Sequence, residues 1–170
     1  MLNRTKKIIY SLLIKERKES RLIDFDRLNL IVSNKSQLKD IEFLEHELIL
    51  SLGLNNEILN EFPTHLYPYC GQGLFIWQYP NQLAKYLKFI SEYEINSYLE
   101  IGVRHGGMFL LTKTYLETVN NNNVYCVGVD IEKSDILKEN AKEFDYEYLV
   151  KSSSSPDFKK IIKDEYFDLV

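Results

Sequence analysis

The sequence predicts an α/β protein in which a parallel sheet follows a helical N-terminal region. Three observations support this fold class. The first ~70 residues have helical apolar spacing. From residue 98 onward, short apolar runs alternate with segments of helical spacing, which favours right-handed crossovers between parallel strands. A glycine-rich turn, Gly102 to Gly107, directly follows the first of those runs.

The C-terminal part divides into alternating strands and helices. Ser155 and Pro156 favour a helix start, as N-cap and first helical residue. A Rossmann-like sheet with strand order 3-2-1-4 is expected. In chain order the predicted elements are strand "SYLEIGV", helix "GMFLLTKTYLETV", strand "VYCVGVDI", helix "KSDILKENAKEF", strand "YEYLV", helix "SPDFKKIIKDE" and strand "YFDLV".

The N-terminal part is predicted to be a separate helical region, residues 1–70, before a sheet domain at 71–170. Residues 22–32 alternate partly and predict a strand or an extended linker, and the prolines and glycines of residues 61–73 predict a break. A further helix is expected from Asn81 to Tyr93. The apolar stripes of the first region are Ile8, Ile9, Leu12 and Leu13, then Leu38, Ile41, Leu44, Leu48 and Ile49.

Composition argues against several classes of partner. The formal net charge is -4 and the pI about 5.5, so no basic field is available for a nucleic-acid backbone. The apolar run near the N-terminus is too short to span a bilayer. Cys70 and Cys126 are isolated in the sequence, which fits a reducing, cytoplasmic location.

The glycine turn predicts a ligand site at the carboxyl end of the first strand. Gly102 allows a sharp turn there, and Gly106 and Gly107 would let a ligand approach the start of a helix. Asp130 ends the second strand, 28 residues after Gly102 (130 − 102). Its carboxylate is placed to accept hydrogen bonds from two ribose hydroxyls.

Two nucleoside cofactors are candidates for a site of this pattern. A nicotinamide site favours G-x-G-x-x-G, but Arg104 occupies the position of the second glycine. Glu100 would repel a pyrophosphate and attract the α-ammonium of S-adenosylmethionine. The pattern therefore favours S-adenosylmethionine and leaves an NAD-binding oxidoreductase as an unfavoured alternative.

The stretches "YLEIGVRHGG" and "VGVDI" resemble motifs I and II of class I S-adenosylmethionine-dependent methyltransferases, over about residues 78–170. The doubled glycine is most similar to the cephalosporin-hydroxylase-like and sugar or macrolide O-methyltransferase branch. Arg104 and Met108 depart from the commonest form of motif I. The resemblance implies that Glu100, Gly102 and Gly106 line the methionine end of the cofactor, that Asp130 binds the ribose, that Ile131 packs on the adenine and that Ser152 or Ser153 touches the adenine edge. Arg104 and Gly107 complete the expected cofactor-binding set.

The resulting expectation is a methyltransferase that acts on a small molecule, with O-methylation favoured. No catalytic base and no metal site are assigned. His105 is favoured as a solvated loop residue, and Trp77, Tyr79 and Tyr86 as packing residues rather than a substrate cage. A non-catalytic assembly module that keeps the Rossmann-like half is the alternative from another class.

The resemblance also implies a sheet of seven strands, ordered 3-2-1-4-5-7-6, of which this sequence supplies four. An incomplete catalytic domain is therefore expected, with a fragment of a longer protein favoured over a shortened natural protein. The hydrophobic edge of strand "YFDLV" would have no neighbour, and such an edge tends to pair with another chain. A homodimer is the expected result.

Overall fold

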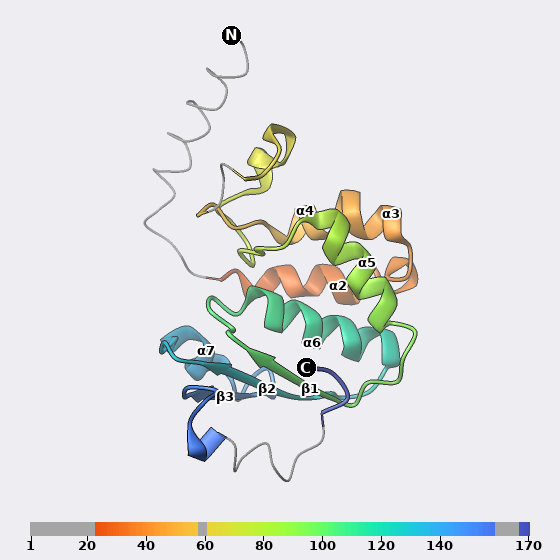
Figure 1. Ribbon diagram of the computed structural model, residues 1–170. Coiled ribbons are helices and arrows are strands. Elements are labelled where there is room, and N and C mark those ends of the chain that lie inside the picture. Colours follow the sequence, from red (N-terminus) through yellow and green to blue (C-terminus); the bar gives the residue numbers. More distant parts are fainter. Residues whose placement is uncertain (1–22, 58–60, 159–166) are drawn as a thin grey trace.

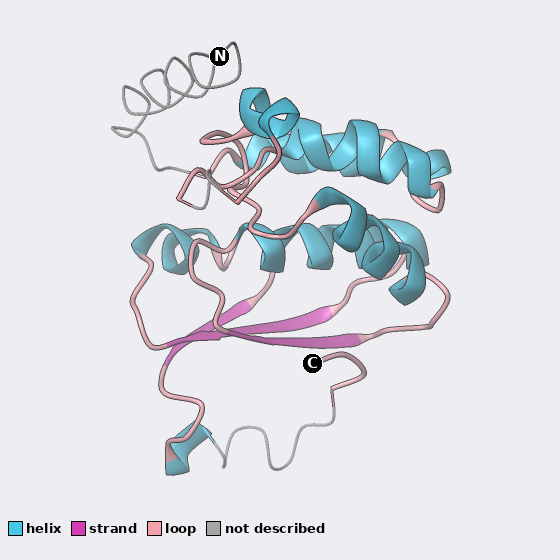
Figure 2. Ribbon diagram, turned by 45° about the horizontal axis from the view of Figure 1, so that its top comes forward, coloured by secondary structure: helices cyan, strands magenta, loops and turns pink. Residues whose placement is uncertain are grey.

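The computed structural model describes residues 23–57, 61–158 and 167–170. Helices lie in layers over one face of a small sheet (Figure 1). Turning the molecule shows the strands beneath these helical layers, with the short helical turn at residues 156–158 on the opposite face of the sheet (Figure 2). The α/β fold class and the parallel sheet predicted from the sequence are confirmed.

The sheet has three parallel strands in the order β1-β2-β3. They are β1 Ser97–Ile101, β2 Tyr125–Asp130 and β3 Glu147–Val150. In the register, Tyr98 pairs with Cys126 and Ile101 with Val129. The carboxyl ends of β1 and β2 therefore meet at one edge of the sheet.

Three helices connect or precede these strands, and short helical pieces form the outer layer. The three are α5 Pro80–Ile90, α6 Gly107–Asn120 and α7 Asp135–Asn140. Each begins with an identifiable signal or turn: Pro80 occupies the first turn of α5, left-handed Gly106 precedes α6, and Ser134 Oγ accepts from Leu137 N at α7. The short pieces are η2 Phe25–Leu28, α2 Asn29–Ser33, η3 Lys35–Gln37, α3 Ile41–Phe43, the π-helical η4 Leu44–Leu48, α4 Ile49–Leu52 and η5 Thr64–Tyr69.

The period of two along β1 assigns its side chains to opposite faces of the sheet. Tyr98 packs in the main core beneath the helices, while Leu99 packs with Val127 and Val129 in a smaller cluster on the other face. Glu100 is on the same face as Tyr98. Its side chain therefore points toward the helical layers, and it is the one acidic side chain of β1.

One core joins the N-terminal pieces to the sheet. Buried residues of the predicted stripe, including Leu38 and Leu44, belong to the same apolar cluster as Phe109 and Tyr115 of α6. The buried Tyr115 hydroxyl donates to the Leu38 carbonyl at 2.7 Å. The boundary at residue 70 between two regions stays a prediction.

Two elements differ from the predictions. The strand or linker predicted for residues 22–32 is wrong: η2 and α2 are helical, because Leu28 and Ile31, three residues apart, are the buried positions of one helical face. The stripe at residues 8–13 and most of the helix predicted after Ser155 lie outside the described residues. Phe158 N does donate to Ser155 Oγ at 3.1 Å, as the predicted N-cap requires.

The fourth strand is reduced to a single bridge, so the predicted order 3-2-1-4 is only approximated. Leu169 pairs with Tyr98 on the edge of β1 away from β2, through Leu99 N–Leu169 O at 2.9 Å and Leu169 N–Ser97 O at 3.1 Å. The Asp168 carboxylate accepts hydrogen bonds from Asn96 N and Ser97 N, at 2.8 and 3.0 Å. Residues 167–170 are therefore held at the start of β1 by a side-chain cap and one bridge, and not by a continuous strand ladder. The homodimer that was predicted from a strand-four edge stays a prediction.

Among the described residues, no helix has the length and apolar character needed to cross a membrane.

The start of α6 lies unusually close to a neighbouring backbone. A Cβ on Gly107 would overlap the main-chain carbonyl of Leu74, which cannot rotate away as a side chain can. This approach holds residues 74–78 above the beginning of α6. Gly107 is therefore required by packing, whatever a ligand needs.

We expect Gly107→Ala to destabilise the protein by about 1–3 kcal/mol, the usual cost of overpacking. An unconstrained helical glycine behaves in the opposite way, because alanine is better in a helix by roughly 0.5–1 kcal/mol. The measurement is the free energy of unfolding in urea. A stabilised variant would contradict the close approach of Leu74.

Candidate functional site

The glycine turn connects β1 to α6 at the edge where the strands end. Gly102 N donates to Val129 O at 2.7 Å, and Gly106 N donates to Val103 O at 2.8 Å. Gly102 has φ +87°, a conformation that side-chain-bearing residues rarely adopt, and no atom lies within 4 Å of where its Cβ would be. The turn therefore leaves open space beside Gly102, as a ligand site needs.

Asp130 binds the same turn from β2. Its Oδ2 accepts from Arg104 N at 2.6 Å and its Oδ1 from Glu132 N at 2.9 Å. One carboxylate thus fixes both the glycine turn and the turn after β2. Each oxygen keeps a further lone pair, so this capping role is compatible with the ribose role predicted from the sequence.

Glu100 is a half-buried acid facing the helical layers. Its carboxylate accepts a hydrogen bond from the Tyr98 hydroxyl. Burial raises the pKa of Glu100 to about 7, and the Tyr98 bond offsets part of that rise. Burial, and then the charge of Glu100, raise the pKa of Tyr98 as well. A cation brought to this carboxylate would stabilise its charged form.

Arg104 and His105 project from the turn toward a segment far away in the sequence. Arg104 has φ +50°, and its guanidinium carbon lies 3.9 Å from the centre of the Trp77 ring. Its Nη2 donates to Glu57 Oε2 at 2.6 Å, and His105 Nε2 lies 3.3 Å from Glu57 Oε1. His105 is therefore held by a carboxylate, not simply solvated as expected.

The glycine turn and Glu100 line a cleft of about 210 Å³. Five of the nine predicted site residues line it: Glu100, Gly102, Arg104, Gly106 and Gly107. Four further lining residues were not predicted from the sequence: Phe75, Gln78, Val103 and Met108. Trp77, which was favoured as a packing residue, also lines the cleft. A second, apolar cleft of about 220 Å³ adjoins it and shares Gln78 and Met108; Gln82, Leu83 and Tyr86 complete its lining.

The other four predicted residues lie at the carboxyl ends of β2 and β3 and do not line that cleft. Asp130 and Ile131 end and follow β2, and the Ile131 side chain is 73% exposed. Lys151 N donates to Asp130 O at 2.8 Å, which brings the end of β3 beside Asp130. Ser152 and Ser153 follow on that exposed surface, where Ser152 Oγ lies 2.8 Å from Ser154 Oγ. Their predicted contacts with adenine stay predictions.

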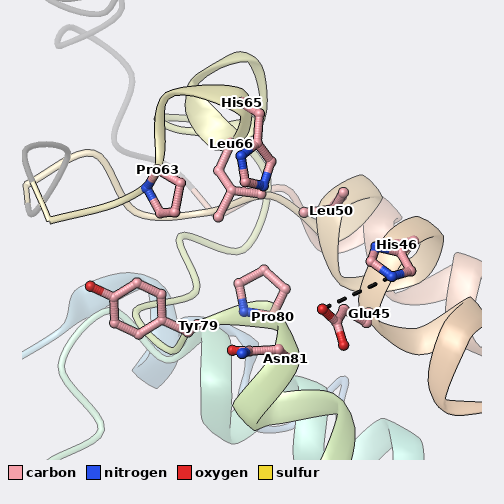
Figure 3. A pocket seen from close by; sticks show the side chains of 9 residues that line it. All are labelled: Glu45, His46, Leu50, Pro63, His65, Leu66, Tyr79, Pro80 and Asn81. Carbon is pink, nitrogen blue, oxygen red and sulfur yellow. Dashed lines mark ion pairs between the residues drawn. The ribbon is translucent and has the colours of Figure 1, made fainter.

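A third cleft, of about 230 Å³, lies away from the glycine turn. It lies between η4, the η5 segment and the start of α5, and His46, His65 and Glu45 are among its lining residues (Figure 3). His46 Nε2 is 4.0 Å from Glu45 Oε1 and 3.4 Å from Glu42 Oε2. Within the described ranges, no three His, Cys, Asp or Glu side chains are grouped to hold a metal ion.

The raised pKa of Glu100 predicts that the stability of the protein depends on pH. The ordinary pKa of Glu100 is 4.5 and the folded one about 7, so the folded state retains this proton to higher pH than the unfolded chain does. Stability from this group is complete below pH 4.5 and is lost as the pH rises to about 7.

We expect Glu100→Gln to remove this loss. From pH 4.5 to pH 8, the free energy of unfolding of the natural protein should fall by roughly 2–4 kcal/mol relative to the variant, since each pKa unit is about 1.4 kcal/mol. Urea unfolding of both proteins across this pH range measures the difference. Parallel pH curves would show that the pKa of Glu100 is the same in the folded protein and in the unfolded chain.

A comparison with protein families identifies the family of the chain. The family model described as Rhamnosyl O-methyltransferase/CmcI matches residues 65–165, which contain β1, the glycine turn, β2 and β3. Neither the curated proteins nor the solved structures include a match to the chain. Because the family model covers more than half of the sequence, the chain belongs to the rhamnosyl O-methyltransferase/CmcI family.

Proposed function

We propose that the chain binds S-adenosylmethionine and transfers its methyl group to an oxygen of a small molecule. The carrying observation is that Glu100, Gly102 and Asp130 meet at the carboxyl ends of β1 and β2, where ligands of open α/β sheets bind. Two acids around an open glycine turn suit a cationic amino-acid group and a ribose better than a pyrophosphate.

The dimensions of the site support a divided arrangement for this cofactor. The cleft of about 210 Å³ is smaller than the roughly 300–1,000 Å³ of sites that enclose a whole drug-sized ligand. In our proposal the amino-acid end enters the cleft beside Glu100. The nucleoside then lies over the exposed surface of Asp130 and Ile131, whose apolar side chain is available to a flat ring.

The adjoining apolar cleft is our candidate for the acceptor. It meets the first cleft at Gln78 and Met108, so a molecule against Leu83 and Tyr86 would lie next to the amino-acid end of the cofactor. The cofactor supplies the reactive methyl when it is bound. The protein's contribution is then mainly to hold the acceptor oxygen in line and to exclude water.

Binding of S-adenosylhomocysteine tests the cofactor assignment. We expect calorimetric titration to detect it and to detect no NADH binding. Asp130→Ala should weaken S-adenosylhomocysteine by about 1–3 kcal/mol, the range for leaving polar groups unpaired. Because Asp130 also caps two turns, circular dichroism must show the variant folded. Unchanged affinity would remove the ribose assignment, and NADH binding would favour the oxidoreductase.

Gly102 provides an independent test of the same site. Valine at this position would meet no atom of the protein within 4 Å of its Cβ, but its side chain would enter the open space and its backbone would be strained at φ +87°. We expect Gly102→Val to abolish S-adenosylhomocysteine binding while the circular dichroism spectrum stays near that of the natural protein. A variant that still binds would show that the turn is only a connector.

A further inference from the structure

We propose that Glu57 is a positioning residue that holds Arg104 and His105 on the wall of the cleft. Glu57 belongs to the N-terminal region, outside the residues that the family model matches. It does not line the cleft itself, whereas Arg104 and His105 do. Its effect on a ligand would therefore pass through those two side chains.

The two oxygens of Glu57 are divided between two consecutive residues of the turn. Oε2 accepts from Arg104 Nη2 at 2.6 Å, and Oε1 lies 3.3 Å from His105 Nε2. The Arg104 guanidinium is thereby held between this carboxylate and the face of Trp77. A carboxylate and an aromatic face together restrict the orientation of a planar, charged guanidinium group.

Glu57 is itself fixed through the buried side chain of Asn55. Its N–H donates to Asn55 Oδ1 at 2.6 Å, and Asn55 is 1% exposed. Asn55 N in turn donates to Ile76 O at 2.8 Å, one residue before Trp77. Glu57 and Trp77 thus lie on two backbone segments that are hydrogen-bonded to each other, and the Arg104 side chain contacts both residues.

The arrangement gives the cleft two walls of opposite charge. Glu100 provides a carboxyl group whose charged form a bound cation would stabilise, and Arg104 provides a cation that Glu57 orients. An α-amino acid group carries the matching ammonium and carboxylate. This last step rests on the proposed function, in which the amino-acid end of the cofactor enters this cleft.

Trp77 allows a test without any ligand, because it is the single tryptophan of the sequence. If Glu57 holds Arg104 on the indole, Glu57→Ala and Arg104→Gln should change the tryptophan emission in the same direction, and the double variant should add little. Glu57→Gln, which keeps one acceptor, should give a smaller change. Glu42→Gln, a change to an exposed carboxylate of α3, should give none.

An emission spectrum that changes in Arg104→Gln but not in Glu57→Ala would overturn the proposal. If Glu57→Ala does not fold, Glu57→Gln still decides it, since an emission spectrum identical to that of the natural protein would also overturn the proposal. These outcomes do not depend on whether the chain is a methyltransferase.

The ligand measurement uses S-adenosylhomocysteine and 5′-methylthioadenosine, which lacks the amino-acid group. Glu57→Ala should weaken the first by about two- to fivefold, the range for a partly exposed ion pair, and leave the second unchanged. Equal weakening of both would indicate a general structural role and overturn the positioning role. If the natural protein binds neither compound, the proposed function fails, and tryptophan emission alone decides the role of Glu57.

Discussion

The cleft depends on the close contact between two backbones, those of Gly107 and Leu74. A neighbouring set of hydrogen bonds fixes the Leu74 segment from its other side: Leu74 N donates to Leu52 O at 2.8 Å and Ile76 N to Gly53 O at 3.0 Å. Residues 74–78 are consequently held between the N-terminal helices and the start of α6. That segment supplies one wall of the cleft and the glycine turn supplies the other.

Asp130 shows why the structural and functional interpretations of a residue need not compete. Both of its oxygens accept backbone N–H groups, so the carboxylate has a structural role without any ligand. The same bonds hold the glycine turn beside the end of β2. A carboxylate that organises the turn is also one that a ligand in the turn would meet at its remaining lone pairs.

The sequence was informative where local pattern and tertiary structure agree. The apolar runs predicted β1, β2 and β3, and the glycines with Glu100 predicted five residues that line one cleft. It failed at residues 22–32, because partial alternation over a few residues does not distinguish an extended segment from one buried helical face. It also failed at the fourth strand, where the Asp168 carboxylate accepts hydrogen bonds from the N–H groups of Asn96 and Ser97 at the start of β1 and a single bridge replaces the expected ladder.

Glu57 could not have been found in this way. It lies 47 residues before Arg104 in an unremarkable polar stretch, and neither its spacing nor its neighbours indicates the contact. The same is true of Trp77, whose apolar flanks favour burial, although one ring face receives a guanidinium. Such residues join the site through the path of the chain in space, which a single sequence does not encode locally.

The hydrogen bond from Tyr115 to Leu38 bears on how this family can vary. The matched residues include all of α6, whose buried face carries Phe109 and Tyr115, but not the helical pieces before residue 65 that cover part of that face. Those pieces cannot be exchanged as freely as a tethered module. Any segment that takes their place in another member must bring comparable apolar surface, and an acceptor for a buried hydroxyl if the tyrosine is kept.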